Sequence, residues 1–157
     1  MNNSGNNNKI YLATALGFSE TGKHVLDDII PKLERIGLTV VDPNKEFEEN
    51  SNDKITPSNN EKMRESICMG AIFDGCRSID ENRICSQIGF YSGIVRGPIF
   101  ALMSDIRYRE NVSGLIDHYV QGCILRSGGS LAIPPHALDN WLVAINEWYA
   151  QFKKKII

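Results

Sequence analysis

The chain has 157 residues and a formal net charge of −2, with 42% hydrophobic and 23% charged residues. This size predicts one domain with a sizeable core, and the near-neutral charge predicts no nucleic-acid partner. No apolar run approaches the roughly 20 residues of a membrane span, so we expect no membrane association. The four cysteines lack metal-ligand spacing, so we expect no metal site and a cytoplasmic protein with reduced thiols.

The first half of the chain is predicted to form a strand, a helix and a second strand after a polar start. Residues 1–8 predict a disordered tail, which leaves 9–157 as the domain. The apolar spacing that follows predicts a strand over 9–15, a loop over 16–22, an amphipathic helix over 23–37 that Gly37 ends, and a strand over 38–41. The polar, Asn-rich residues 44–60 predict a mobile loop.

The second half continues the alternation of helices and strands. We expect helices over 59–68, 81–95, 111–124 and 138–152, and strands over 70–73, 98–103 and 131–133. Strands that alternate with helices throughout predict an α/β fold, with about five parallel strands and helices on both faces. In such sheets small ligands bind at the carboxyl ends of the strands, so polar residues in those loops are candidate site residues.

Several acidic residues at this edge have both a functional and a structural interpretation. Asp74 directly follows an apolar strand, so its carboxylate could point into the crevice, or Asp74-Gly75 could simply form a turn. Asp80 and Glu81 open a helix, where stabilisation by the helix dipole would by itself explain two carboxylates. The sequence pattern leaves both interpretations open.

The segment from Ser19 to Lys23 also has two interpretations. Its hydroxyl groups resemble the phosphate loop of flavodoxins, which would make the protein a flavin-binding module. His24 occupies the final hydroxyl position, and the loop lies farther beyond the strand than that fold usually allows, which weighs against a flavin. A helix capped by Ser19, with Glu20 in its first turn, explains the same residues.

An ordered set of motifs spans nearly the whole folded chain. It comprises Ile10-Tyr11-Leu12-Ala13, Gly17-Phe18-Ser19, Asp42-Pro43, Asp74-Gly75, the helix 80–89 with Gln87-Ile88-Gly89-Phe90, the segment FALMSDIR, and Ser127-Gly128-Gly129. In this order the motifs resemble those of the nucleoside 2-deoxyribosyltransferase family. The resemblance implies a Rossmann-like or flavodoxin-like domain, and a homodimer or higher homo-oligomer in which a neighbouring subunit completes each site.

The resemblance also implies an activity, the transfer of 2-deoxyribose from a nucleoside or nucleotide to a free base or to water, without a cofactor. A glutamate attacks the anomeric carbon in that chemistry, and a glycosyl ester forms and is then released. Carried onto this chain, Tyr11 orients the nucleophile, and Glu81, with Asp80 beside it, handles the leaving base. The residues implied in substrate binding are Asp74, Gly17, Phe18, Ser19, Gly75 and Gly114.

The nucleophile position departs from the family pattern, because Gln87 occupies it. An amide is a poor nucleophile and carries no negative charge to stabilise an oxocarbenium-like transition state. Three interpretations stay open. The chain could be an engineered Glu-to-Gln variant of an active enzyme, a catalytically silent relative that binds a nucleoside or nucleotide, or an N-glycosidase in which Asp80 or Glu81 activates water.

Overall fold

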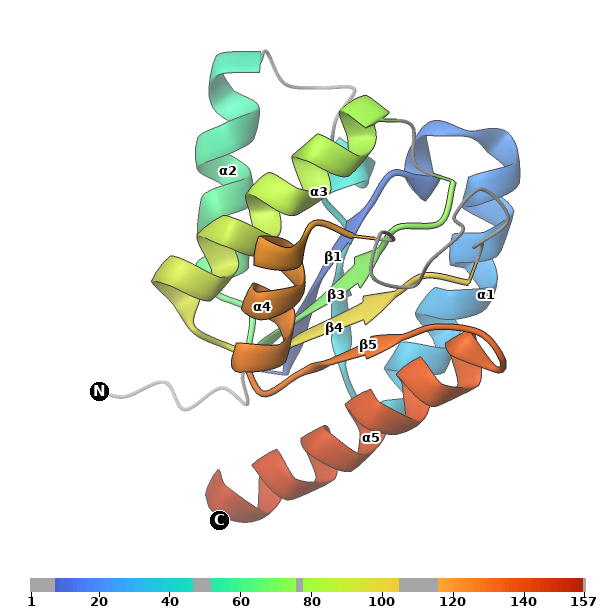
Figure 1. The fold of residues 1–157 in the computed structure, drawn as a ribbon, viewed down its shortest axis with the longest axis vertical. Helices are drawn as coiled ribbons and strands as arrows, with labels where there is room; N and C mark the ends of the chain where they lie inside the picture. Colours follow the sequence, from blue (N-terminus) through green and yellow to red (C-terminus); the bar gives the residue numbers. More distant parts are fainter. Residues whose placement is uncertain (1–7, 47–51, 76–77, 105–115, 157) are drawn as a thin grey trace.

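The structure of the protein is a computed structural model that describes residues 8–46, 52–75, 78–104 and 116–156. Five parallel strands form one sheet in the order β2-β1-β3-β4-β5 (Figure 1). The strands are β1 (Lys9–Thr14), β2 (Thr39–Val41), β3 (Cys68–Ile72), β4 (Ile99–Leu102) and β5 (Ser130–Ala132). This sheet, with helices in the connections, confirms the predicted α/β fold.

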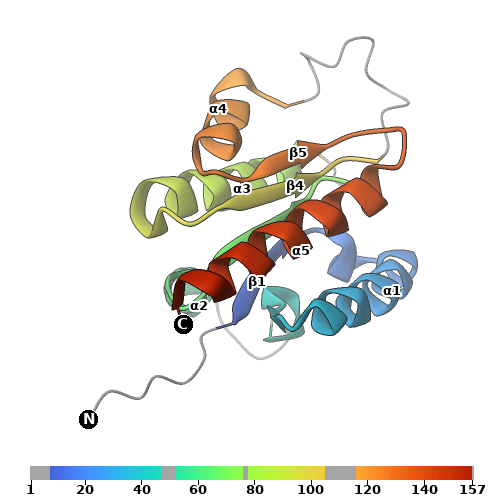
Figure 2. The same ribbon diagram turned by 90° about the horizontal axis from the view of Figure 1, so that it is seen from below.

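Helices cover both faces of the sheet (Figures 1 and 2). They are α1 (Glu20–Ile36), α2 (Asn52–Arg64), α3 (Ser78–Phe90), α4 (His118–Arg126) and α5 (Ala137–Ile156). Side chains of α1 and α5 pack on one face, and those of α2, α3 and α4 pack on the other. Every residue of β3 and β4 is buried, as in strands that are covered on both sides. Among the described residues, no helix has the length and apolar character needed to cross a membrane.

The first strand divides its side chains between the two faces. Ile10 and Leu12 pack in the layer of α1 and α5, whereas Tyr11 and Ala13 pack in the layer of α3. This division follows from the alternation of side chains along a strand. The hydroxyl group of Tyr11 therefore lies on the α3 side of the sheet, where it needs a hydrogen-bond partner.

Helix α1 begins at Glu20 rather than at the predicted Lys23. Ser19 Oγ accepts a hydrogen bond from the backbone N–H of Gly22 at 3.0 Å, so the serine cap sets the start of the helix. The predicted end at Gly37 is confirmed, because this residue adopts a φ of 102° that other residues rarely adopt.

The prediction of a mobile loop over 44–60 is wrong in its second part. Helix α2 begins at Asn52 and ends at Arg64, whereas the predicted helix covered 59–68. Among the described side chains of α2, only Met63 is buried. A polar helix that packs through one apolar side chain lacks the apolar stripe from which helices are predicted.

Helix α3 begins at Ser78, before the predicted residue 81, and it ends in a π-helical turn over Tyr91–Val95. The buried Tyr91 hydroxyl donates a hydrogen bond to the carbonyl of Ser66 at 2.9 Å. Ser66 precedes β3, so this bond anchors the end of the helix at the amino edge of the sheet. The predicted start of the next helix, at residue 111, lies outside the described residues.

Asn8, the last residue of the predicted tail, forms hydrogen bonds with the folded chain. The side-chain amide of Asn8 donates to the carbonyl of Gly37 at 2.8 Å, and the Asn8 carbonyl accepts from the N–H of Thr39 at 2.9 Å. Asn8 is thus tied to the edge of the sheet.

Replacing Gly129 with alanine is expected to destabilise the fold by at least about 2 kcal/mol, since overpacking a rigid site carries a cost of this size. A Cβ atom at this position would lie 1.8 Å from the carbonyl oxygen of Ile99, which is backbone of β4 and cannot move aside cheaply. Urea unfolding measures the change. Gly122→Ala in α4 is the control, because a Cβ atom there meets nothing within 4 Å. It should be neutral or stabilising by up to about 1 kcal/mol.

Candidate functional site

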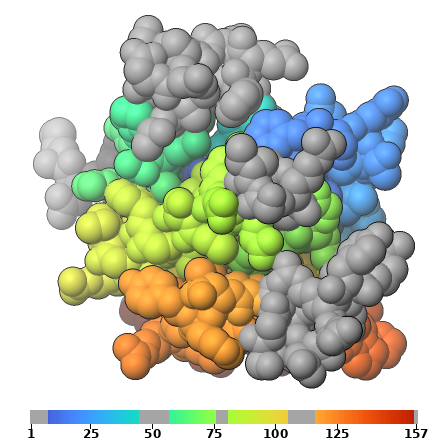
Figure 3. Space-filling view, turned by 45° about the horizontal axis from the view of Figure 1, so that its top comes forward, coloured from blue at the N-terminus to red at the C-terminus, as the bar shows by residue number. Residues whose placement is uncertain are grey.

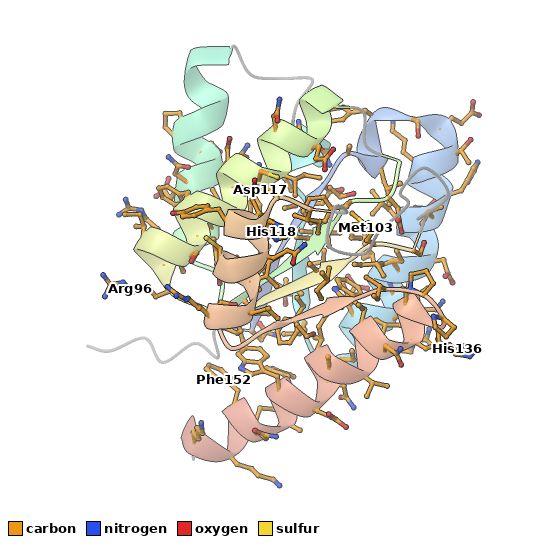
Figure 4. All side chains as sticks on the ribbon, viewed as in Figure 1. Arg96, Met103, Asp117, His118, His136 and Phe152 are labelled. Atoms are coloured by element: carbon orange, nitrogen blue, oxygen red, sulfur yellow. The ribbon has the colours of Figure 1, made fainter. Side chains whose placement is uncertain are left out.

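The order of the strands marks one edge of the sheet as the place for a ligand. β1 pairs with β2 on one side and with β3 on the other, so the order of the strands reverses at β1. In open α/β sheets, small ligands bind at the carboxyl ends of the strands at such a switch point. Met103 and His136 lie toward this edge, and Arg96 lies at the opposite one (Figure 4).

Tyr11 and Gln87 meet between β1 and α3, the helix that runs across the middle of the face in Figure 3. The Gln87 Nε2 donates a hydrogen bond to the Tyr11 hydroxyl oxygen at 3.0 Å. Burial raises the pKa of Tyr11 above its ordinary value; the positive charge of Arg83 lowers it and the negative charge of Asp42 raises it. The pair at the candidate nucleophile position is therefore uncharged at neutral pH.

Arg83 lies one helical turn before Gln87 and reaches the end of β1. Its Nη2 donates to the carbonyl of Thr14 at 3.2 Å, and its guanidinium carbon lies 4.4 Å from the centre of the Phe18 ring. Its Nε is buried and has no hydrogen-bond partner among the described residues. The guanidinium plane is held between a strand end and an aromatic ring.

Asp74 is held by the loop that follows the neighbouring strand. The backbone N–H of Ser104 donates to its Oδ1 at 2.7 Å, and the Ser104 hydroxyl donates to its Oδ2 at 2.6 Å. Ile72 pairs with Leu102, so positions 74 and 104 come two residues later on adjacent strands. Gly75, with a φ of 71°, continues the chain as a turn. Asp74-Gly75 thus forms a turn, and the Asp74 carboxylate is bonded to Ser104 at the carboxyl end of the neighbouring strand.

The loop after β1 packs tightly against the loop after β2. A Cβ atom on Gly17 would lie 2.8 Å from the Asn44 side chain. Asn44 Nδ2 donates to the Thr14 carbonyl at 3.1 Å, and its backbone N–H donates to Asp42 Oδ1 at 2.9 Å. Phe18 remains 46% exposed at this loop. The side chain of Ser19 is engaged as the cap of α1.

The structure says less about the other predicted site residues. Glu81 is half-buried near the start of α3. Each residue of a helix turns by about 100°, so position 81 is rotated by about 120° around the helix axis from position 87. Position 80 lies on the same face as position 87, about two turns earlier. The side chain of Asp80 and all of Gly114 lie outside the described residues. The roles of Tyr11, Gln87, Asp80, Glu81 and the substrate-binding set stay predictions.

Four residues that hold this edge together were not among the predicted site residues. They are Thr14, Asn44, Arg83 and Ser104. A signal existed for Ser104, because it follows its strand at the same offset at which Asp74 follows β3. A signal also existed for Arg83, because a residue four positions before Gln87 on a helix shares its face. Asn44 gave no signal within a polar segment.

Comparisons with known proteins bear on the fold. No protein-family model matches the sequence, and no curated protein matches it. Among solved structures, the Clostridium botulinum CMP N-glycosidase BcmB is similar over 92% of this chain and 98% of its own, with a TM-score of 0.58 and 19% identity. The 2-deoxyribosyltransferase of Bacillus psychrosaccharolyticus is similar over 59% of this chain and 70% of its own, with a TM-score of 0.49 and 19% identity.

Both of these proteins belong to the nucleoside 2-deoxyribosyltransferase family. This chain has the fold of that family. The resemblance that the sequence motifs indicated is thereby confirmed at the level of the fold. At 19% identity the likeness is one of fold, and the chemistry of this chain depends on its own residues.

We expect the burial of Tyr11 to make the protein less stable in alkali. Burial raises the pKa of Tyr11 in the folded state. The stabilisation of the fold by the protonated Tyr11 hydroxyl is therefore fully present below the unfolded pKa of about 10, and it is lost as the pH rises above that value. The loss approaches about 1.4 kcal/mol per pH unit. Urea unfolding between pH 8 and 11 should show a smaller alkaline slope in Tyr11→Phe than in the wild type.

Tyr119→Phe is the matched control for this measurement, because the Tyr119 side chain is 76% exposed. It should keep the wild-type slope. Equal slopes in the wild type and in Tyr11→Phe would mean that the Tyr11 hydroxyl ionises without loss of the fold.

Proposed function

We propose that the carboxyl edge of this sheet binds a nucleoside or nucleotide, and that the protein cleaves its N-glycosidic bond and passes the sugar to another base or to water. The observation that carries the location of the site is the hydrogen bond between Gln87 and Tyr11, which joins α3 to β1 at the switch point of the sheet. The similarity in fold to a CMP N-glycosidase supports it. We also propose a cytoplasmic homo-oligomer in which a neighbouring subunit contributes to each site, on the strength of the family resemblance.

The chemistry assigns different roles to the groups at this edge. Cleavage of an N-glycosidic bond passes through an oxocarbenium-like state, so a carboxylate must support the anomeric carbon or activate the attacking water. Gln87 cannot supply that charge. In the hydrolytic route, Asp80 or Glu81 takes a proton from water, and the water oxygen bonds to the anomeric carbon as the carbon–nitrogen bond breaks. The carboxylic acid so formed then gives that proton to the departing base.

Asp74 is the candidate for holding the sugar. Each of its oxygens accepts one hydrogen bond from Ser104, which fixes the direction of the carboxylate. Carboxylate oxygens accept hydrogen bonds from hydroxyl groups, so a carboxylate fixed in this way suits a sugar. Gln87 and Tyr11, on the α3 side of the sheet, are the candidate positioning groups.

A second candidate function is binding without cleavage. The uncharged Gln87–Tyr11 pair favours it, because the position that needs a nucleophile holds an amide bonded to a phenol. Asp74 and the loop at Phe18 would still hold a nucleoside or nucleotide in this case. The two candidates differ in whether base is released.

Changing Gln87 to glutamate should create or raise the cleavage of 2-deoxynucleosides or their 5′-monophosphates. A carboxylate at position 87 can form a glycosyl ester, and we expect a gain of about a hundredfold or more, the scale of a positioned catalytic group. Chromatography of released base measures the rate, and an added acceptor base separates transfer from hydrolysis. Gln121→Glu, on α4, controls for an added negative charge.

If neither the wild type nor Gln87→Glu releases base from any purine or pyrimidine substrate, the cleavage proposal is contradicted. Calorimetric binding of the same compounds would then support the second candidate.

If the wild type hydrolyses its substrate, one of the two carboxylates at the start of α3 should carry the reaction. Asp80→Asn or Glu81→Gln is expected to lower the hydrolysis rate by about 10² to 10⁴, and the other substitution by much less. The helix register favours Asp80, which shares the face of Gln87. Rates unchanged in both variants would remove these residues from the mechanism.

A further inference from the structure

We propose that Arg83 is a specificity-determining residue that binds a phosphate group of the ligand, so that the site takes nucleoside 5′-monophosphates in preference to nucleosides. This inference rests on the proposed nucleoside or nucleotide site and names its substrate class. It comes from the hydrogen bonding of Arg83 and from its position one helical turn before Gln87.

Among the described residues, one hydrogen-bond acceptor faces Arg83, the carbonyl of Thr14. A guanidinium group has five N–H donors. One of the nitrogens, Nη2, bonds to the Thr14 carbonyl at 3.2 Å, while Nε is buried without a partner among the described residues. Buried donors in folded proteins are nearly always satisfied, so an orphaned Nε calls for an acceptor that the described residues do not supply.

The carboxylates nearest this edge are engaged elsewhere. Asp74 accepts two hydrogen bonds from Ser104, and Asp42 accepts one from Asn44. None of the ion pairs among the described residues includes Arg83. A half-buried cation without an anionic partner is costly, and an anion carried by the ligand would remove that cost.

The geometry of the guanidinium suits a phosphate. The Thr14 carbonyl and the Phe18 ring hold its plane, so the side chain is ordered before a ligand arrives. A fixed planar fork can donate two parallel hydrogen bonds to phosphate oxygens, which a lysine ammonium cannot do. The guanidinium therefore discriminates by shape as well as by charge.

The position of Arg83 relative to Gln87 also fits. One turn of helix separates the two residues, a rise of about 6 Å along α3. A ligand whose sugar lies beside the Tyr11–Gln87 pair would extend its 5′ carbon and phosphate along the helix toward Arg83. Since Gln87 and Tyr11 are both uncharged, Arg83 supplies the positive charge beside them.

Isothermal titration calorimetry can test this assignment by comparing a deoxynucleoside with its own 5′-monophosphate, for one purine and one pyrimidine. We expect the wild type to bind one monophosphate at least about tenfold more tightly than its nucleoside, the size of one charge-assisted hydrogen bond. Arg83→Met should bring this ratio close to one while leaving nucleoside affinity nearly unchanged. Arg83→Lys should restore only part of the preference.

Arg126→Met, at an exposed arginine of α4, is the matched control and should keep the wild-type ratio. Inorganic phosphate is titrated separately into the wild type and into Arg83→Met. Binding to the wild type that is absent from Arg83→Met supports the assignment of the phosphate to Arg83. Thermal unfolding establishes that Arg83→Met is folded, and Arg83→Lys carries the test if it is not.

Three outcomes would overturn the inference: equal affinity of the wild type for nucleoside and monophosphate, an equal loss of both affinities in Arg83→Met, or no binding of either compound. Its failure is distinguishable from failure of the proposed cleavage. A phosphate preference without base release keeps the role of Arg83 and removes the cleavage reaction. Base release at equal rates from nucleosides and monophosphates keeps the cleavage reaction and removes the role of Arg83.

Discussion

The parallel pairing of β1 with both β2 and β3 is the constraint on which the rest of the molecule depends. It makes β1 an inner strand with helices over both faces, and the side-chain alternation along β1 places a phenol, Tyr11, inside the layer of α3. A polar group in that environment must be hydrogen bonded, and Gln87 meets the need from the facing helix. The same pairing brings the loops after β1, β2 and β3 to one edge, where Thr14, Asn44 and Arg83 join into a single hydrogen-bonded group.

The electrostatic character of this edge separates binding from catalysis. The Tyr11–Gln87 pair holds its geometry without charge, Asp74 is fixed by Ser104, and Arg83 supplies a cation beside Phe18. Such a set can orient a sugar and an anionic group. Support for a developing positive charge at an anomeric carbon needs a carboxylate, and the uncharged Tyr11–Gln87 pair does not supply one. The proposed cleavage therefore depends on a carboxylate elsewhere at the site, whereas binding does not.

Most of the fold could be predicted from the sequence, because buried strands and amphipathic helices leave regular apolar spacing. The contact between Tyr11 and position 87 could be anticipated only through resemblance, since it joins residues 76 positions apart. The contacts of Arg83 with Thr14 and Phe18 could not be predicted for the same physical reason, because they form only in the folded chain. The first half of α2 was not predicted because residues 52–58 are mostly polar and give no apolar stripe.

The π-helical turn at Tyr91–Val95 has a consequence for how this protein can change over evolution. Tyr91 pins the far end of α3 to Ser66, at the amino edge of the sheet. Each residue added to or removed from a helix turns the rest by about 100°, so a change of length between Gln87 and the pinned Tyr91 would rotate Gln87 and Arg83 away from β1. The spacing between Gln87 and the amino-edge anchor is therefore fixed by the fold.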